Sequence, residues 1–436
     1  MPRRPNFVFI LADDLGHADL GCYGARAEVP ISPAIDALSA AGLRFTHGYA
    51  NSPVCSPTRF ALMTGRWQYR LRGAAEEPLV AWGDKVIGLP PEHPTLPSLL
   101  RDAGYATALF GKWHLGYPPH FGPLKSGYER FFGPLSGAVD YFSHRDLGGK
   151  HDLYEQDESV VRRGYLTDLI SDAAVDFVQR LEGHTPFLLS VHYTAPHWPW
   201  ETRDDEDESR RIGSNLAHLD GGSLATYRQM IRHMDEGVGR IVAALRDTGQ
   251  FDDTLIVFTS DNGGERFSDN WPFVGGKMDL LEGGIRVPLL AHWPARIAPG
   301  CHTDTPVLTM DWTVTMLAAA GVAPSSCYPL DGWSLLPLFE DPAWNPDRAL
   351  FWRMKHRLQR AVRHGPWKYL AMDGHEYLFD LSADERERAN LAGRFPQRLA
   401  DLRMQWEQWA AELPGIPDDA TVSLAYGPDD LPRSSV

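Results

Sequence analysis

The sequence predicts an α/β fold: a large, mixed but mostly parallel sheet sandwiched by helices, followed by a small C-terminal domain with a short antiparallel sheet and a helix. Two observations predict this fold. Before about Asp341, short apolar runs rich in β-branched and aromatic residues alternate with amphipathic helical stretches, as in parallel strands joined by helices. After that point, short strand-like runs are separated by charged turns, as in an antiparallel sheet.

The large domain is expected over residues 1–345. Its predicted strands, in chain order, are 7–12, 107–110, 187–193, 255–259 and 287–292. Helices are expected near 33–41, 96–103 and 227–246. The last helix has one apolar stripe that would face a core, formed by Met230, Ile231, Met234, Val238, Ile241, Val242 and Leu245.

The small domain is expected over residues 346–436. A chain of 436 residues exceeds the usual size of a single core, which favours a second domain. Its predicted strands are 349–353, 359–363, 367–371 and 377–380, and its helix lies near 396–411. The tail from Leu413 is rich in Pro, Asp and Gly and has no period, so we expect a mobile end or an arm on another surface, such as a second subunit of a homo-oligomer.

Composition and charge exclude several classes of partner. Acidic residues number 57 against 42 basic ones, and no long Lys/Arg cluster could follow a phosphate backbone, so we expect no nucleic-acid partner. The apolar run Phe7 to Ala12 is too short for a secretory signal or a membrane span, so we expect a soluble, cytoplasmic protein with no membrane partner. The four cysteines include no C-x-x-C spacing, which argues against a disulfide framework or a zinc–thiolate site.

Polar residues follow four of the predicted strands. Ligands of open α/β sheets collect beyond the carboxyl ends of the strands, so we expect these residues to form one constellation. They are Asp13 and Asp14, Lys112 and His114, His197, and Asp261 and Asn262.

Two of these strand ends carry only oxygen ligands. Adjacent carboxylates such as Asp13 and Asp14 repel each other, and a cation between them relieves the repulsion, although a solvated turn or a helix N-cap is the alternative interpretation. Together with Asp261 and Asn262 they favour a hard divalent cation, Ca²⁺, Mg²⁺ or Mn²⁺, over zinc.

Cys55 lies in SPVCSPTRFALMTGR, where Pro57 suits the first turn of a helix and Arg59 lies one turn further on. A cysteine at a helix N-terminus beside an arginine is expected to have a lowered pKa and to be reactive; a buried structural cysteine is the alternative. In FGKWHLG, Lys112 and His114 would point to the same side of an extended segment. Lys277 follows two glycines that would let backbone approach a ligand closely.

These motifs resemble the type I sulfatases of the alkaline phosphatase superfamily. The resemblance runs from about Asn6 to Leu391 and rests on an ordered set: NFVFILADDLGHADLGCYG, CSPTR at 55–59, GYATALFGKWHLG, TAPHWPW, VFTSDNGG and GGKMDLLEGGIRVP. It implies an alkaline-phosphatase-like fold and an arylsulfatase-like sulfuric ester hydrolase that acts on a small sulfated substrate.

The resemblance also implies the nucleophile and the metal site. In that family a separate formylglycine-generating or other maturation enzyme converts the cysteine of C-x-P-x-R to Cα-formylglycine, and Cys55 is the matching position; Thr58 stands where most members have Ser. One divalent cation, with Ca²⁺ as the first choice and Mg²⁺ or Mn²⁺ as alternatives, would be held by residue 55 and by Asp13, Asp14, Asp261 and Asn262.

The remaining roles come from the same resemblance. Arg59 and Lys112 would orient the gem-diol formed by hydration of the aldehyde, and His114 would be its acid–base partner. One hydroxyl would attack sulfur to give a covalent sulfo-enzyme, while His197 and Lys277 stabilise or protonate the departing oxygen. A phosphonate or phosphate ester hydrolase of the same superfamily, or a pseudoenzyme in which Cys55 stays unmodified, are the alternatives. The physiological substrate is not fixed by the sequence.

Overall fold

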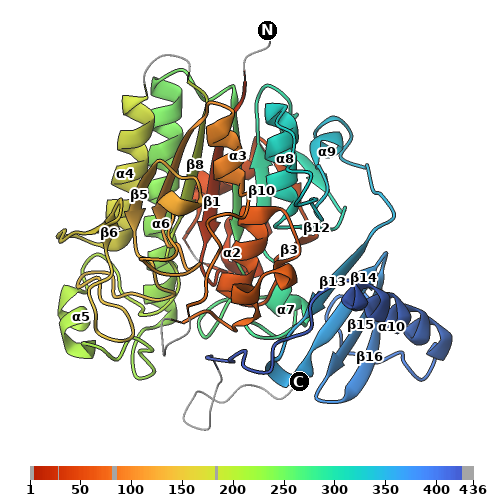
Figure 1. Cartoon of the computed structure of the whole chain (residues 1–436). Coiled ribbons are helices and arrows are strands. Elements are labelled where there is room, and N and C mark those ends of the chain that lie inside the picture. Colours follow the sequence, from red (N-terminus) through yellow and green to blue (C-terminus); the bar gives the residue numbers. More distant parts are fainter. Residues whose placement is uncertain (1–3, 28, 81–85, 182–184, 425–436) are drawn as a thin grey trace.

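The computed structural model describes residues 4–27, 29–80, 86–181 and 185–424 (Figure 1). The strands of the large sheet are β1 (Asn6–Ala12), β2 (Leu43–Phe45), β4 (Ala106–Gly111), β5 (Arg130–Gly133), β6 (Tyr154–Glu155), β7 (Glu158–Ser159), β8 (Phe187–His192), β9 (Thr254–Ser260), β10 (Leu289–His292) and β11 (Cys301–Thr303). Within the described residues they form one sheet in the order β11-β2-β10-β9-β1-β8-β4-β5-β6-β7.

The centre of this sheet is parallel. β1 pairs in parallel with β8 on one side and with β9 on the other, and β4 pairs in parallel with β8 and β5. β10 runs antiparallel to both β9 and β2, so the sheet is mixed. A separate parallel pair is formed by β3 (Gly48–Tyr49) and β12 (Val307–Leu308). The predicted mixed, mostly parallel sheet is therefore confirmed.

Helices cover both faces of the sheet (Figure 1). One face packs against α1 (Pro33–Ala40), α4 (Leu166–Arg180) and α6 (Leu224–Asp247), and the other packs against α2 (Cys55–Thr64), α3 (Leu96–Asp102), α8 (Asp311–Ala320) and α9 (Leu336–Glu340). The short helices α5 (Glu206–Ile212) and α7 (Glu282–Ile285) lie toward the lower end of the large domain in Figure 1. Short 3₁₀ helices are η1 (His17–Asp19), η2 (Gly21–Tyr23), η3 (Gln68–Arg70), η4 (Arg72–Ala75), η5 (Leu124–Ser126) and η6 (His356–Leu358).

The central strand β1 shows why the sheet needs helices on both sides. Every residue of β1 is buried, and successive side chains of a strand point to opposite faces. Val8 and Ile10 belong to the core under α4 and α6, whereas Phe9 and Leu11 belong to the core under α2 and α3. A strand that is apolar on both faces is stable only in the middle of such a sandwich.

The small domain contains the predicted antiparallel sheet and helix. Its strands β13 (Ala349–Arg353), β14 (Arg360–His364), β15 (Trp367–Met372) and β16 (His375–Asp380) form an antiparallel meander, and α10 (Pro396–Ala411) packs on it. Leu402 of α10 joins a core with Val362, Tyr369 and Leu378 of the sheet. The predicted domain boundary between residues 345 and 346 stays a prediction.

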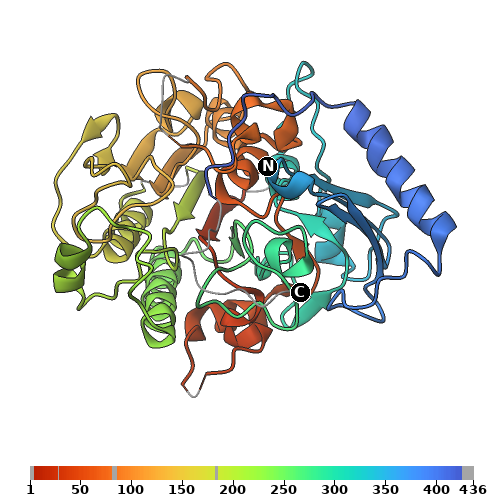
Figure 2. The ribbon, with the colours of Figure 1, turned by 90° about the horizontal axis from the view of Figure 1, so that it is seen from below.

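The tail after α10 returns to the large domain. Figures 1 and 2 show this dark-blue segment leaving α10 and running over the large domain. Val422 forms a parallel bridge with Glu77. Up to residue 424 the tail is thus an arm laid on the chain's own large domain. Among the described helices, none is both long and apolar enough to cross a membrane.

Candidate active site

The predicted site residues come together because four central strands deliver them to one edge of the sheet. Asp13 follows β1 directly, Lys112 follows β4, and Asp261 follows β9. His197 lies five residues after β8, which is the neighbour of both β1 and β4. These four side chains are buried, so the predicted constellation exists as one enclosed polar cluster.

Asp14 is the centre of one half of this cluster. Its backbone has φ of 63°, in the left-handed region. Its Oδ2 atom lies 2.7 Å from Nζ of Lys277 and 3.5 Å from Nε2 of His197. Its Oδ1 atom accepts a hydrogen bond of 2.7 Å from Nδ2 of Asn262. One carboxylate therefore links a lysine, a histidine and an amide that are far apart in the sequence.

Asp13 and Asp261 form the other half with two cations. Nζ of Lys112 lies 2.5 Å from Oδ2 of Asp13, and Nη2 of Arg59 lies 3.7 Å from the same oxygen. Arg59 also donates from Nε and Nη2 to Oδ2 of Asp261, at 3.0 and 2.8 Å. Burial, followed by Asp13, raises the pKa of Asp261, and burial raises the pKa of Asp14. Desolvated carboxylates at this density require positive charge around them.

The donor set fits a hard divalent cation. Oδ1 of Asp13 and Oδ1 of Asn262 are buried, and neither has a hydrogen-bond partner among the described residues. Two groups of possible ligands have their ligand atoms within 4.8 Å of one another: Asp13, Asp14 and His197, and Asp13, Cys55 and Asp261. Unpaired oxygens beside crowded carboxylates are the donors that Ca²⁺ or Mg²⁺ would use.

Cys55 is the first residue of α2 and is buried in this cluster. The expected lowering of its pKa is wrong: burial raises the pKa of the thiol to about 11, against the opposing effect of Lys112 and Lys277. The loss of water around a thiolate outweighs the helix N-terminus and the nearby cations. As a cysteine, residue 55 is therefore a neutral thiol and a weak nucleophile at neutral pH.

His114 is fixed by a backbone carbonyl. Its Nε2 atom lies 2.7 Å from the carbonyl oxygen of Leu79, which can only accept, so Nε2 carries the proton. Its Nδ1 atom is buried and has no partner within the described chain. Burial and then Lys112 lower the pKa of His114 well below its ordinary value. The ring is thus neutral, with the lone pair of Nδ1 free to accept a proton.

The backbone around His114 differs from the prediction. His114 has φ of 58°, so the segment from Lys112 is not extended through His114. The turn sends the two side chains to different partners, since Lys112 reaches Asp13 and His114 reaches Leu79.

His197 has the opposite tautomer to His114. Its Nδ1 atom donates to the carbonyl oxygen of Trp198 at 2.6 Å, which leaves the lone pair on Nε2 facing Asp14. Burial and then Lys277 lower the pKa of His197 well below its ordinary value. Nε2 of His197, 3.5 Å from a carboxylate oxygen of Asp14, can therefore accept a proton or contact a cation.

The glycines beside Lys277 pack against other backbone. A Cβ atom on Gly276 would lie 2.8 Å from the carbonyl oxygen of Gly264, and one on Gly284 would lie 2.4 Å from the carbonyl oxygen of Gly276. The loop that carries Lys277 is therefore folded tightly onto the segment after Asn262. The glycines place Lys277 by close contact within the protein.

Several residues that support the site were not predicted. The hydroxyl of Tyr227 donates to the carbonyl oxygen of Asp14 and to Oδ2 of Asp19, at 3.3 and 2.6 Å. Glu265 adds negative charge that contributes to the raised pKa of Asp14. Asp19 lies inside the motif that predicted the metal site, but its role depends on a contact with α6 that the sequence does not display.

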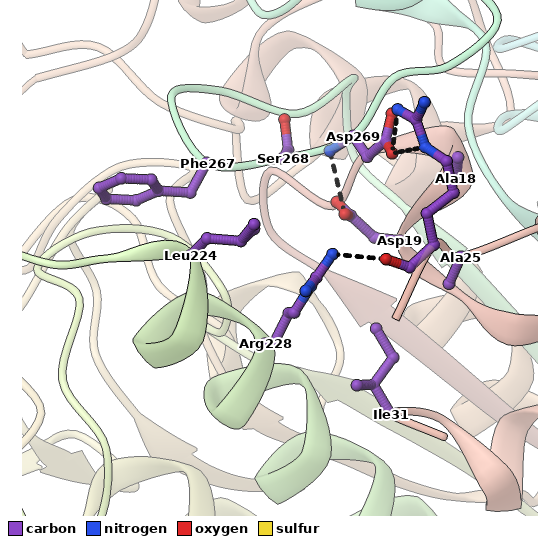
Figure 3. A pocket seen from close by; sticks show the side chains of 10 residues that line it. Ala18, Asp19, Ala25, Ile31, Leu224, Arg228, Phe267, Ser268 and Asp269 are labelled. Carbon is purple, nitrogen blue, oxygen red and sulfur yellow. Dashed lines mark hydrogen bonds and ion pairs between the residues drawn. The ribbon is translucent and has the colours of Figure 1, made fainter. Parts of the chain in front are cut away.

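A cavity of about 340 Å³ lies beside Asp19, which is linked to Asp14 through Tyr227 (Figure 3). Asp19 and Asp269 line it together with Arg228 and the apolar side chains of Leu224 and Phe267. The amide of Asp269 donates to Oδ1 of Asp19 at 3.0 Å. None of the predicted site residues lines this cavity, so the cavity adjoins Asp19 and is separate from the cluster described above.

Comparison with known proteins identifies the family. The Sulfatase family profile matches residues 5–322, and a second profile, N-sulphoglucosamine sulphohydrolase, C-terminal, matches residues 276–409. The chain is 34% identical to N-acetylgalactosamine-6-sulfatase of Homo sapiens in an alignment of 357 residues that covers 77% of this chain and 66% of that protein. It therefore spans just under two thirds of the length of that relative. It is 32% identical to arylsulfatase A of Homo sapiens, over 99% of this chain and 91% of that protein.

Solved structures agree with the sequence relatives. The structure of Ps i-CgsB in complex with k-i-k-neocarrahexaose has 32% identity and a TM-score of 0.84, and the match covers 94% of each chain. PsFucS1 sulfatase from Pseudoalteromonas sp. has 26% identity and a TM-score of 0.76, with 94% of this chain and 90% of that chain covered. The chain therefore belongs to the sulfatase family.

Proposed function

We propose that this protein hydrolyses a sulfate ester to an alcohol and sulfate, and that residue 55 is the nucleophile after conversion of Cys55 to Cα-formylglycine by a separate maturation enzyme. The observation that carries the proposal is the placement of Cys55 in a buried group with Asp13 and Asp261, with Arg59 bound to the same Asp261. The neutral thiol of Cys55 is a poor nucleophile, which favours a role for the modified residue.

A divalent cation belongs to this proposal, with Ca²⁺ as the first choice. Asp13, Asp14, Asp261 and Asn262 would hold it together with residue 55, and the unpaired oxygens of Asp13 and Asn262 support this set. When bound, the cation would lower the pKa of a hydroxyl on residue 55 and neutralise charge on the sulfate oxygens.

The side chains around residue 55 divide the remaining work. Arg59 and Lys112 are held by carboxylates and interact electrostatically with residue 55, so they would orient its hydroxyls and offset the negative charge that develops on the sulfate oxygens. Removing one such preorganised donor typically lowers a rate by about 10²- to 10³-fold.

Two neutral histidines and a lysine would handle the protons. Attack by one hydroxyl on sulfur forms a sulfate ester at residue 55 and breaks the bond between sulfur and the alcohol oxygen. Lys277, next to Asp14, would stabilise or protonate that oxygen, and His197 would do so after its Nε2 atom takes up the proton of the attacking hydroxyl. Nδ1 of His114 would then take the proton of the second hydroxyl, so that the carbon–oxygen bond to sulfate breaks and the aldehyde is restored.

A sulfated sugar is the substrate class that the relatives favour. N-acetylgalactosamine-6-sulfatase is named for a sugar sulfate, and Ps i-CgsB was solved with a neocarrahexaose. Arylsulfatase A is named for aryl sulfates, so an aryl sulfate serves as the assay substrate.

The first test is mass spectrometry of the tryptic peptide 45–59 from protein made in its native host. An aldehyde or its hydrate at residue 55, with turnover of sulfate esters in proportion to the converted fraction, supports the proposal. An unmodified thiol in fully active protein overturns it. Rates on sulfate and phosphate esters with the same leaving group separate the proposal from a phosphate or phosphonate ester hydrolase, and no turnover in fully converted, metal-loaded protein indicates a pseudoenzyme.

A further inference from the structure

Leu79 lies outside the catalytic motifs, and its backbone hydrogen-bonds both to Ser56, next to the proposed nucleophile, and to His114, the proposed base. The amide of Leu79 donates to Oγ of Ser56 at 2.8 Å, next to residue 55 at the start of α2. The carbonyl of the same residue accepts the hydrogen bond from Nε2 of His114 at 2.7 Å. Leu79 is buried, so water does not compete for either bond. The position of Leu79 therefore sets the distance between the helix of Cys55 and the ring of His114.

The ring of His114 is confined from a second side. A Cβ atom built on Gly137 would lie only 2.4 Å from Cε1 of His114, which means that the backbone of Gly137 closes this side of the ring. With Nε2 held by Leu79, the lone pair of Nδ1 has one orientation. If the Leu79 carbonyl moved away, the proton could shift to Nδ1 and the ring would lose its function as a base.

Leu79 ends a short segment, residues 76–79, which we call the bracket. The small domain holds it on one side, because the carboxylate of Glu77 accepts hydrogen bonds from the backbone amides of Lys355 and His356 at 2.7 and 2.8 Å. These bonds neutralise part of the cost of burying Glu77, which has its pKa raised to about 7 by burial.

The C-terminal arm, residues 414–424, holds the bracket on the other side; we call it the strap. The amide of Glu77 donates to the carbonyl oxygen of Thr421, and the amide of Ser423 donates to the carbonyl oxygen of Glu77, both at 2.9 Å. These bonds extend the parallel bridge between Glu77 and Val422. Figure 2 shows the strap, in dark blue, crossing over the orange part of the large domain.

Two strap side chains add bonds of their own. Oγ of Ser423 donates to the carbonyl oxygen of Pro78 at 2.6 Å, directly before Leu79. The amide of Thr421 donates to Oε2 of Glu76 at 3.0 Å, and the hydroxyl of Thr421 donates to the same oxygen. The strap therefore hydrogen-bonds to Glu76, Glu77 and Pro78, and the backbone of the next residue, Leu79, hydrogen-bonds to Ser56 and His114.

We propose that the strap is a positioning element: Thr421 and Ser423 hold the bracket, and the bracket holds His114 in the orientation and tautomer that the reaction uses. This inference rests on the proposed function for the role of His114, but the geometry can be tested without turnover. Misplacement of a reacting group by about 1 Å costs up to about 10²-fold in rate, so a remote hydrogen bond can have a measurable effect on kcat.

The test compares the double variant Thr421→Val/Ser423→Ala with its conservative counterpart Thr421→Ser/Ser423→Thr. Asp418→Asn, an exposed position on the same strap, is the matched control. Three quantities are measured: deuterium exchange of the peptide that contains Leu79, the ¹⁵N chemical shifts of His114, and kcat and KM on an aryl sulfate. The double variant should exchange faster, show a mixture of His114 tautomers, and lose about tenfold in kcat with KM within about twofold. The conservative variant and the control should match wild type.

Two outcomes overturn the proposal. Unchanged exchange would mean that the strap does not hold the bracket, and faster exchange with unchanged kcat would mean that the bracket does not position His114. If converted wild-type enzyme has no turnover, the proposed function fails, and the exchange and tautomer measurements alone decide about the strap. If the double variant does not fold, Ser423→Ala replaces it, because it removes a single hydrogen bond.

Discussion

Arg59 donates two hydrogen bonds to one oxygen of Asp261: Nε and Nη2 lie 3.0 and 2.8 Å from Oδ2, and both side chains are buried. This leaves Oδ1 of Asp261 beside the backbone amide of Asp14, at 3.4 Å. The arginine thus fixes the carboxylate in one rotation. The other oxygen of Asp261 therefore lies beside Asp14, another residue that would hold the cation.

Arg59→Lys is expected to lower kcat/KM by about 10²- to 10³-fold, because a single ammonium cannot reproduce the two-point contact. Arg59 also belongs to the maturation motif, so turnover must be expressed per molecule with an aldehyde at residue 55, measured by mass spectrometry. Arg66→Lys, in the segment after α2, is the control and should stay within about twofold of wild type. Full turnover per converted Arg59→Lys molecule would contradict this role for Arg59.

Removal of the cation should lower both activity and stability. The crowded carboxylates Asp13, Asp14 and Asp261 repel one another, so a bound cation stabilises the folded state; at a free concentration of 100 times Kd the gain is about 2.7 kcal/mol. We expect a chelator to lower Tm and turnover, and Ca²⁺ to restore both more completely than Mg²⁺ or Mn²⁺.

The control for this prediction distinguishes cation binding at the buried cluster from cation binding at surface carboxylates. Asp13→Asn should reduce the Tm gain that Ca²⁺ produces, whereas Asp172→Asn, at an exposed ion pair on α4, should leave that gain unchanged. A wild-type Tm that none of the three ions changes would exclude a structural cation at this site.

Much of the fold could be predicted because its central elements carry strong patterns. The predicted helix 396–411 has the bounds observed for α10, and the buried strands β1, β8 and β9 are mostly apolar. The strands β6 and β7 were missed because two residues have no period. Their pairing depends on β5, and a partner of this kind is visible only in the folded chain.

Some features of the candidate site could likewise be predicted from the sequence, and others could not. Asp13 and Asp261 could be placed together because both follow buried parallel strands that end at one edge. The Leu79 carbonyl could not, since it acts through backbone that any residue could supply. The pKa of Cys55 was predicted in the wrong direction because the sequence shows the helix start and Arg59 but not the burial of the thiol.

Glu201 should make stability depend on pH. Burial, followed by the charge of Asp140 and a side-chain hydrogen bond with it, raises the pKa of the Glu201 carboxyl from 4.5 to about 10. Below pH 4.5 both the folded and the unfolded chain carry the proton. Above that pH only the unfolded chain releases it, so the stability that depends on the protonated carboxyl is lost progressively as the pH rises toward 10.

Glu201→Gln keeps a neutral side chain of similar shape and removes this dependence. The Tm of the variant relative to wild type should therefore rise from pH 5 to pH 8, by about 2 to 4 °C. Differential scanning calorimetry at the two pH values measures the difference, with the exposed Glu385→Gln as control. A difference that stays constant or falls with pH would show that Glu201 is ionised in the folded protein.

Lys368 connects the two domains through a buried ion cluster. Its Nζ atom lies 2.9 Å from Glu282 of α7 and 2.8 Å from Glu387, and all three side chains are buried. Lys368→Met would leave two carboxylates without their shared cation, and the expected loss is about 3 to 5 kcal/mol in the free energy of unfolding.

Denaturant unfolding of Lys368→Met measures this loss, and Arg403→Met supplies the comparison. Arg403 pairs with Glu376 at 2.9 Å where both are partly exposed, so its removal should cost about 0 to 1 kcal/mol. Adding Glu387→Gln to Lys368→Met should recover part of the loss, because the carboxylate that lost its cation is then neutral, whereas Glu282 still pairs with Arg286. If Lys368→Met costs no more than Arg403→Met, the cluster does not hold the small domain to α7, and the aromatic contacts of Trp67 with Phe351 and Trp409 would be the main attachment.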